Sequence, residues 1–473
     1  MNRIIVLSLG AVLICSSCVN STQQKYPPID FDFPRIDLSS YEEQKKRPYQ
    51  DKTLALAVAI SGGGHRAANF GVGVLVALEE EGLLHEVDYL STVSGGGFAA
   101  AAYIETLIYH LDERKKNHRD YKLKTWLEKP EEVDITDPDD YLKRHLERGY
   151  ETSLFWGFLN PKTWFSNIDR GDFLEKKIDS RILGYNKRGR SLLLNDVFRD
   201  KEQADCDGEE CRKMVPYWVA NAAIFQNGAI FPFIPNIIEH YNVIEYTHRA
   251  KIEVLGEDKG NIPLAVGVKA SASFPVVFPA TTLKCSRKSA DAADSKAFIH
   301  LLDGGLADNL GVITAIDILR EDPSPRKVLL VIDAYKDDPQ PYSHKKGSPT
   351  AVQVALRIMG IGLDSNHTRI EDQVETLCAK DGIKPVFLSF ESLKREDEDE
   401  IVKKVSQAKA ETAQSEAEML KAKSILYENA RDVNTSFNIT EDEQALLFQA
   451  GKKVVDNEMR KIKDAIENNQ TSN

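Results

Sequence analysis

The sequence lacks the features by which proteins bind nucleic acids or nucleotides. Its 61 Lys and Arg residues are outnumbered by 73 Asp and Glu residues, which gives a formal net charge of −12 at pH 7. Nucleic-acid binding favours a basic surface, so this balance argues against it, and it also argues against general electrostatic attraction to anionic lipid. The glycine-rich run at 61–66 has no Gly-Lys-Ser/Thr ending and no GxGxxG spacing, which argues against a phosphate or dinucleotide loop.

Metal-ligand motifs and internal repeats are missing as well. No second CxxC or HxxxH pattern accompanies the six cysteines, so we predict no metal and no cofactor.

The apolar run Ile4–Ile14 is too short to span a bilayer. It follows the basic Arg3 and precedes small residues, an order typical of a secretory signal peptide.

A cysteine follows that run directly. Ser16-Ser17-Cys18 is similar to the lipobox of bacterial lipoproteins, in which the cysteine becomes a lipid-bearing N-terminus. This resemblance implies a signal peptide at 1–17 and a lipid anchor on Cys18, since two or more acyl chains hold a protein stably on a membrane. The alternative is an ordinary signal cleaved nearby, giving a soluble exported protein. Val19 and Asn20 lack the aspartate linked to inner-membrane retention, so we expect a bacterial envelope protein anchored in the outer membrane.

The other cysteines are compatible with export. Cys206 and Cys211 bracket the polar segment DGEE and are close enough for a small disulfide. Cys285 and Cys378 remain as a second possible pair. The sequence alone leaves the connectivity open.

The order of elements predicts a doubly wound α/β sheet. Residues 18–50 are polar and interrupted by proline, as in a tether. The chain then reads strand, loop, helix twice over, with glycine clusters where each strand meets its helix. The expected strands are 53–60, 87–93, 217–224, 327–335 and 384–390, and the expected helices are 67–84 and 98–110. Sites in such sheets lie at the carboxyl ends of the strands.

Two further regions fall outside this pattern. A charged insertion covers about 111–170, and the aromatic-rich segment 153–174 at its end suits either core packing or an acyl groove or interfacial lid beside a lipid site. From residue 392 the sequence becomes helical and highly charged, which we interpret as a C-terminal extension, 392–473, of solvated outer helices.

Three short segments carry residues suited to ester chemistry. Ser94 ends an expected strand and precedes Gly95-Gly96-Gly97, the arrangement of a nucleophile on a tight elbow at a helix N-terminus. The Gly62-Gly63-Gly64 run offers consecutive amides that can form an anion-binding nest. Asp303 follows an apolar stretch and precedes two glycines; alone it would be a turn former. Together the three segments indicate a serine hydrolase site.

The three segments resemble the patatin-like phospholipase family, which uses a serine-aspartate dyad. Gly62–Ala67 is similar to its oxyanion loop, Thr92–Gly96 to its Gly-x-Ser-x-Gly elbow, and Asp303-Gly304-Gly305 to its Asp-Gly-Gly/Ala motif. ASASFPVVFPA (270–280) and DRGDFLEKKI (169–178) also resemble the family. Thr92 and Ala67 stand where the family has glycine.

The resemblance implies a three-layer α/β/α catalytic domain over 51–391, with a mainly parallel central sheet. It further implies that Ser94 is the nucleophile, Asp303 the general base, and the amides of Gly62, Gly63 and Gly64 the oxyanion donors. Arg66 has two interpretations: a salt bridge that shapes the loop, or a contact to substrate phosphate. The expected partner is membrane phospholipid; the oligomeric state is left open.

Alternative functions use the same segments. The site would also suit smaller esters, triglycerides or acyl transfer, and Thr92 and Ala67 would also suit an inactive patatin-like envelope scaffold. A histidine triad is disfavoured, because after Asp303 only His344 and His367 remain, and both read as surface residues. His65 lies in the oxyanion loop itself, too close in sequence to act as a clear base.

Overall fold

The computed structural model describes most of the chain beyond residue 52. The described residues are 53–117, 170–184, 189–198, 215–275, 277–289, 292–336, 348–412, 430, 433 and 439–467. The predicted signal peptide, tether and Cys18, most of the 111–170 insertion, and Cys206, Cys211 and His344 lie outside them. Within the described part of the chain, no helix is both long and apolar enough to cross a membrane.

One half of the sheet is parallel and carries the strands predicted from the sequence. Its strands are β1 (Leu54–Ile60), β2 (Tyr89–Val93), β3 (Tyr217–Ile224), β9 (Arg326–Asp333) and β10 (Ile383–Ser389). They lie in the order β10-β9-β1-β2-β3 and pair in parallel throughout. Continuous apolar runs such as LALAVAI suit this position, because a parallel strand is covered by helices on both faces.

The other half of the sheet is antiparallel and was not predicted. Its strands are β4 (Ile230–Phe233), β5 (Val243–His248), β6 (Lys251–Val254), β7 (Thr281–Ser289) and β8 (Ala292–Asp303). β8 pairs with β3, and the sheet continues through β7 and β5 to β6, while β4 pairs with the end of β3. The described strands thus form one ten-stranded sheet with a parallel centre.

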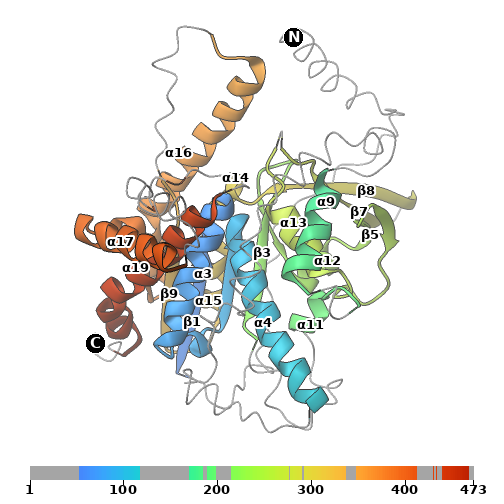
Figure 1. Ribbon diagram of the computed structural model, residues 1–473. Coiled ribbons are helices and arrows are strands. Elements are labelled where there is room, and N and C mark those ends of the chain that lie inside the picture. Colours follow the sequence, from blue (N-terminus) through green and yellow to red (C-terminus); the bar gives the residue numbers. More distant parts are fainter. Residues whose placement is uncertain are drawn as a thin grey trace.

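Helices cover both faces of the sheet, which confirms the predicted α/β/α class. The longer or site-forming ones are α3 (Gly64–Glu80), α4 (Gly95–Asn117), α9 (Arg170–Lys177), α13 (Leu264–Ser271), α14 (Gly305–Asp308), α15 (Val312–Glu321), α16 (Ala351–Lys380), α17 (Arg395–Thr412) and α19 (Glu441–Glu467). The short α11 (Leu194–Phe198) and α12 (Pro235–His240) accompany the antiparallel half. α3, α4 and α19 lie in front of the sheet in Figure 1, and α15 packs behind β1, β2 and β9.

The C-terminal extension is present as predicted, but α19 belongs to the core. Leu447, Ala450 and Val454 on α19 are fully buried, and the helix runs along α3. A Cβ on Gly73 of α3 would lie 2.2 Å from the Phe448 carbonyl oxygen, so the two helices approach at backbone distance. The interpretation of this region as solvated outer helices is therefore wrong for α19.

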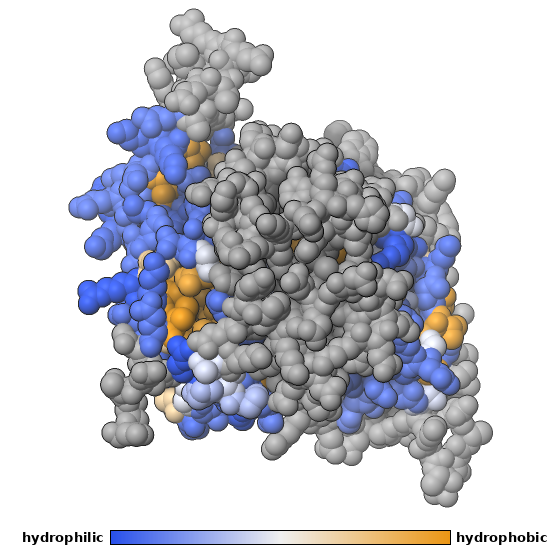
Figure 2. Space-filling view, turned by 90° about the horizontal axis from the view of Figure 1, so that it is seen from below, coloured by the Kyte–Doolittle hydropathy of each residue, from blue (hydrophilic) through white to orange (hydrophobic). Residues whose placement is uncertain are grey.

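The remaining cysteines and the surface also bear on the predictions. Cys285 in β7 and Cys378 in α16 are buried free thiols, so the possible pairing between them is wrong. Burial raises the pKa of both thiols to about 12. Hydrophilic side chains predominate over the described part of the face seen from below, as expected from the high content of charged residues (Figure 2).

Candidate active site

The register of three neighbouring strands places Ser94 beside Asp303. β3 lies between β2 and β8, with Val93 of β2 paired to Asn221 and Asp303 of β8 paired to Ala222. Ser94 directly follows β2 and Asp303 is the last residue of β8. Both residues therefore lie at the carboxyl edge of the parallel strands, where sites of α/β proteins form.

Ser94 has the backbone geometry of a nucleophile elbow. Its φ is +48°, in the left-handed region that non-glycine residues seldom adopt. Its amide donates to Ser271 Oγ at 2.9 Å, which holds the strained residue in place. A serine on such a turn between a strand and a helix presents its hydroxyl at the strand end.

The first two glycines after Ser94, Gly95 and Gly96, are required by close backbone packing. A Cβ on Gly95 would lie 2.0 Å from the Gly64 carbonyl oxygen, and one on Gly96 would lie 2.5 Å from that of Ile60. The elbow and the Gly62–Gly64 loop are thus in direct backbone contact. Side chains at these positions would push the two loops apart.

Asp303 is a buried carboxylate, and the Ser94 side chain lies near enough to affect its pKa. The Gly305 amide donates to Asp303 Oδ1 at 2.9 Å. Burial raises the pKa of Asp303 to about 6, although the hydrogen bonds from Gly305 and Ser94 oppose the shift. The group is therefore a stronger base than an exposed aspartate yet still mostly ionised at pH 7.

The glycine loop carries two backbone amides that are free to donate. Gly63 has a φ of +138° and Gly64 a φ of +57°, and α3 begins at Gly64 without a side-chain cap. No described residue accepts a hydrogen bond from either amide. The Gly62 amide, in contrast, donates to the Asn309 carbonyl oxygen at 2.8 Å, so Gly62 shapes the loop in this structure and is not an open donor. The positive end of α3 adds to the field at the two remaining amides.

Arg66 ties this loop to neighbouring segments through hydrogen bonds. Its side chain is buried and donates from Nε to the Ala334 carbonyl oxygen at 2.8 Å and from a terminal nitrogen to that of Val433 at 3.2 Å. These contacts fit the loop-shaping interpretation of Arg66.

The two departures from the family pattern are accommodated without strain. Thr92 lies within β2, and its hydroxyl accepts from Trp218 Nε1 at 2.9 Å while donating to the Val219 carbonyl oxygen at 3.3 Å. The positive φ of the elbow falls on Ser94 instead. Ala67 is buried within the first turn of α3.

Residues 271–273 support both Ser94 and Asp303, and sequence reasoning missed their role. Besides the Ser271 hydroxyl that accepts from Ser94, the Ser271 carbonyl oxygen accepts from the Gly304 amide at 3.1 Å and that of Ser273 accepts from the Asp303 amide at 3.0 Å. In the sequence, the ASAS segment is notable only for its resemblance to the family.

A buried ion pair anchors the helix that leads to Ser271. Lys269 of α13 contacts Glu175 of α9, and His248 Nδ1 lies 2.5 Å from the same carboxylate. Burial alone would raise the pKa of Glu175, but Lys269 and His248 hold it below its ordinary value. The segment DRGDFLEKKI, which carries Glu175, thus supports the site from a distance.

The histidines do not complete a triad among the described residues. His65 is buried on α3, with its ring 6.5 Å from that of Phe98. His367 is only 1% exposed, so its interpretation as a surface histidine is wrong. It meets Asp333 and Glu371, and no sequence motif joined these three residues.

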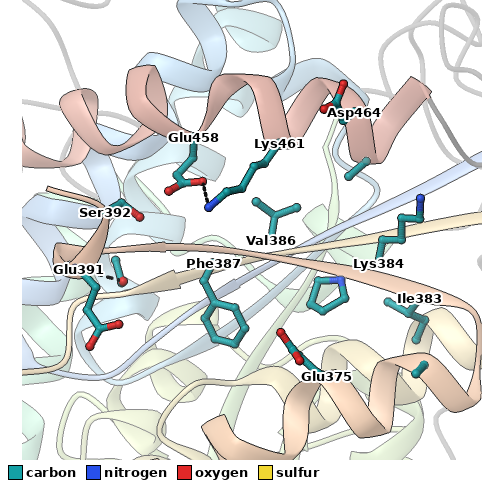
Figure 3. Close-up of a pocket in the computed structure, with 14 residues that line it drawn as sticks. Glu375, Ile383, Lys384, Val386, Phe387, Glu391, Ser392, Glu458, Lys461 and Asp464 are labelled. Atoms are coloured by element: carbon teal, nitrogen blue, oxygen red, sulfur yellow. Dashed lines mark hydrogen bonds and ion pairs between the residues drawn. The ribbon is translucent and has the colours of Figure 1, made fainter.

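A large cavity lies elsewhere, at the β10 edge of the sheet. It has a volume of about 820 Å³ and lies between β10, α16 and α19. Figure 3 shows charged side chains around it, with Lys461 paired to Glu458 on α19. Ser94, Asp303 and the glycine loop do not line this cavity, so it is separate from the candidate active site.

Comparison with known proteins places the chain in a family. Residues 58–316, more than half of the chain, match the patatin-like phospholipase family. The chain therefore belongs to this family, and the match spans the elbow, the glycine loop and Asp303. A search of curated protein sequences gives no significant match.

The solved structures that the chain matches are distant in sequence. Human GIVD cytosolic phospholipase A2 is 12% identical with a TM-score of 0.44, and the match covers 88% of this chain and 62% of that one. VipD from Legionella pneumophila is 12% identical with a TM-score of 0.28, covering 85% of this chain and 67% of that one. The chain thus spans less than two thirds of the length of the human phospholipase.

Proposed function

We propose that this chain is a serine acyl-ester hydrolase that acts on phospholipids or lysophospholipids. The observation that carries the proposal is that strand register places Ser94, on a left-handed elbow, beside the buried Asp303 at the carboxyl edge of the parallel strands. Family membership supports a lipid acyl substrate.

The reaction follows from the positions of these groups. Ser94 Oγ attacks the ester carbonyl carbon while its proton passes to the Asp303 carboxylate. The amides of Gly63 and Gly64 donate to the oxyanion of the tetrahedral intermediate, each contributing on the order of 3 kcal/mol. Asp303 then gives the proton to the leaving alcohol. In the second step Asp303 takes a proton from a water molecule that attacks the acyl-enzyme, and it returns this proton to Ser94 Oγ as the fatty acid leaves.

The inactive-scaffold alternative rested on Thr92 and Ala67. Thr92 has both its hydroxyl hydrogen bonds satisfied inside β2, and Ala67 packs in α3, so neither disturbs the elbow. This accommodation favours an active enzyme.

The decisive experiment compares wild type with Ser94→Ala and Asp303→Asn. Each protein is offered phospholipid as micelles and below the micellar concentration, and is treated with a fluorophosphonate probe; circular dichroism checks the fold. We expect hydrolysis and labelling in wild type, and loss of both in Ser94→Ala. Wild-type protein that is folded but neither hydrolyses lipid nor takes the probe would support the scaffold. Equal rates on monomeric esters and micelles would favour small-ester substrates.

We further propose that Cys18 anchors the enzyme in the envelope of a bacterium, on the outer membrane. The support is the lipobox-like sequence and the lipid substrate. Intact-mass measurement of the membrane-extracted protein beside Cys18→Ala tests the anchor: a soluble, unmodified wild type would contradict it.

A further inference from the structure

Three metal-ligating side chains meet where β9 ends against α16. Asp333 is the last residue of β9, and His367 and Glu371 lie one turn apart on α16. His367 Nε2 is 3.2 Å from Asp333 Oδ2 and 3.7 Å from Glu371 Oε2. The three potential ligand atoms lie within 4.8 Å of one another. The same ring nitrogen therefore faces both carboxylates.

The imidazole at the centre of this cluster is buried, and among the described residues its only polar contacts are the two with Asp333 and Glu371. His367 is 1% exposed, and neither of its ring nitrogens forms a well-directed hydrogen bond with any described residue. A buried polar group left in this state costs free energy, on the order of 1–3 kcal/mol. Coordination of Nε2 to a cation would give one of the two ring nitrogens a partner.

The surrounding residues orient the ligands. The Tyr335 ring stacks on the His367 ring with centroids 3.9 Å apart, and its hydroxyl donates to Asp364 Oδ1 at 2.8 Å. The Tyr335 amide donates to Asp333 Oδ1 at 2.9 Å, which leaves Oδ2 directed at the imidazole. Such outer contacts fix ligand orientation in metal sites.

We propose that Asp333, His367 and Glu371 bind one divalent transition-metal ion, with Zn²⁺ the best fit. One imidazole nitrogen and two carboxylate oxygens are ligands that Zn²⁺ accepts at about 2.0–2.2 Å, which in a tetrahedral site separates neighbouring ligand atoms by roughly 3.3 Å. The observed separations of 3.2 and 3.7 Å are close to this value. The ion would neutralise the two carboxylates, and the Glu371 side chain, 41% exposed, provides an entry path and room for a water ligand.

The ion would tie together two elements that border the candidate active site. Ala334, next to Asp333, donates its amide to Ser61 Oγ at 3.0 Å, at the start of the glycine loop. Asn366, next to His367, donates to the Ala307 carbonyl oxygen of α14 at 2.6 Å, just beyond Asp303. The ion would thus stabilise the framework of the site.

Metal content tests this proposal without an activity assay. Untagged full-length protein is prepared with Zn²⁺ and desalted, and its metal content is measured by elemental mass spectrometry. Zn²⁺ is then replaced by Co²⁺, whose absorption spectrum reports the coordination geometry. We compare wild type with His367→Gln and Glu371→Gln, and with His240→Gln, an exposed histidine at the end of α12, as the matched control.

We expect about one Zn²⁺ per wild-type and control chain and a higher melting temperature with the ion. In both ligand variants, affinity should fall by about 100-fold or more, since loss of a direct ligand exceeds the 10–100-fold cost of an outer contact. Glu371 is partly exposed, so Glu371→Gln should fold even if His367→Gln does not. The proposal would be overturned if wild-type protein bound no metal, or if the ligand variants bound it as well as wild type. His367 would then be a protonated histidine between two carboxylates. Neither result depends on whether the chain hydrolyses lipid.

Discussion

At the scale of single residues, Asp303 has to meet two opposing requirements. A general base must be ionised at the working pH, yet it must also retain affinity for a proton. Burial raises the pKa of Asp303 to about 6, and the Gly305 and Ser94 hydrogen bonds keep it from rising further. No histidine is then needed to take the Ser94 proton. The same burial has consequences for both activity and stability.

The activity should depend on the ionisation of Asp303. Below a pH of about 6 the carboxylate is protonated and cannot accept the Ser94 proton, so kcat/KM should fall about tenfold per pH unit and level off above about pH 7. Initial rates on micellar phospholipid from pH 4.5 to 8 measure this. A profile that stays flat down to pH 4.5 would exclude Asp303 as the base.

The stability should change with pH in the opposite direction. The pKa of Asp303 is about 6 in the folded protein and 3.8 ordinarily, so the folded state binds this proton more tightly than the unfolded state does. The proton therefore stabilises the fold fully below about pH 3.8, and this stabilisation is lost as the pH rises through 6. Ionised Asp303 then costs the fold about 3 kcal/mol at neutral pH. Asp303→Asn should therefore be inactive but raise the free energy of unfolding at pH 7.5, with no gain at pH 4.

Ser94→Ala is the control for that measurement. It is also expected to be inactive, but it keeps the buried carboxylate. Urea unfolding of the three proteins at both pH values separates the effects, and a gain of equal size in both variants would show that the cost does not arise from Asp303.

At the scale of elements, the loop after α13 holds the nucleophile and the base at once. Ser271 accepts from the Ser94 amide, and the carbonyl oxygens of Ser271 and Ser273 accept from Gly304 and Asp303. The register of β2, β3 and β8 brings the two loops together, and these hydrogen bonds fix their separation. Ser271 is thus a positioning residue for the proposed reaction.

Ser271→Ala should lower kcat far more than it changes KM. It leaves the Ser94 amide buried without an acceptor, at a cost of about 1–3 kcal/mol, and frees the elbow to move. The matched control is Ser273→Ala, because the Ser273 hydroxyl donates to the Lys269 carbonyl oxygen and does not touch Ser94. Steady-state kinetics and urea unfolding separate the two. Similar kcat values for both variants would contradict the positioning role.

Prediction from the sequence was strong where a local pattern matches the final environment. β1 is a continuous apolar run, as suits a strand covered by helices on both faces, and Ser94, Gly63, Gly64 and Asp303 lie in short motifs. The antiparallel half was missed: β6 (KIEV) is largely exposed, and β7 (TTLKCSRKS) carries polar side chains, so neither shows a buried strand pattern.

Groups assembled from distant segments were also beyond the sequence. Ser94 contacts Ser271, and His367 contacts Asp333. In each pair the two residues come from different elements, so only the tertiary packing brings them together. The Gly62 amide was assigned as an oxyanion donor because nothing in the sequence indicated that Asn309 would accept from it.

At the scale of the whole molecule, α19 extends the core beyond the expected catalytic boundary at residue 391. A charged sequence concealed an apolar stripe, because residues such as Leu447 and Val454 recur at helical spacing among lysines and glutamates. α3, which carries the glycine loop at its start, is covered by this helix. The family match ends at residue 316, so the packing of α19 is a feature of this chain beyond that match.

The contact between α3 and α19 should tolerate no added side chain. A Cβ on Gly451 would lie 2.3 Å from the Phe70 carbonyl oxygen, so Gly451→Ala must push the helices apart and should lower the free energy of unfolding by about 1–3 kcal/mol. Gly362 on α16 has nothing within 4 Å, and Gly362→Ala should raise stability by about 0.5–1 kcal/mol through helix propensity alone. Thermal and urea unfolding measure both. Since α3 begins at the glycine loop, moving α3 away from α19 in Gly451→Ala should also reduce hydrolysis. A Gly451→Ala variant as stable and as active as wild type would show that α19 lies outside the cooperative core.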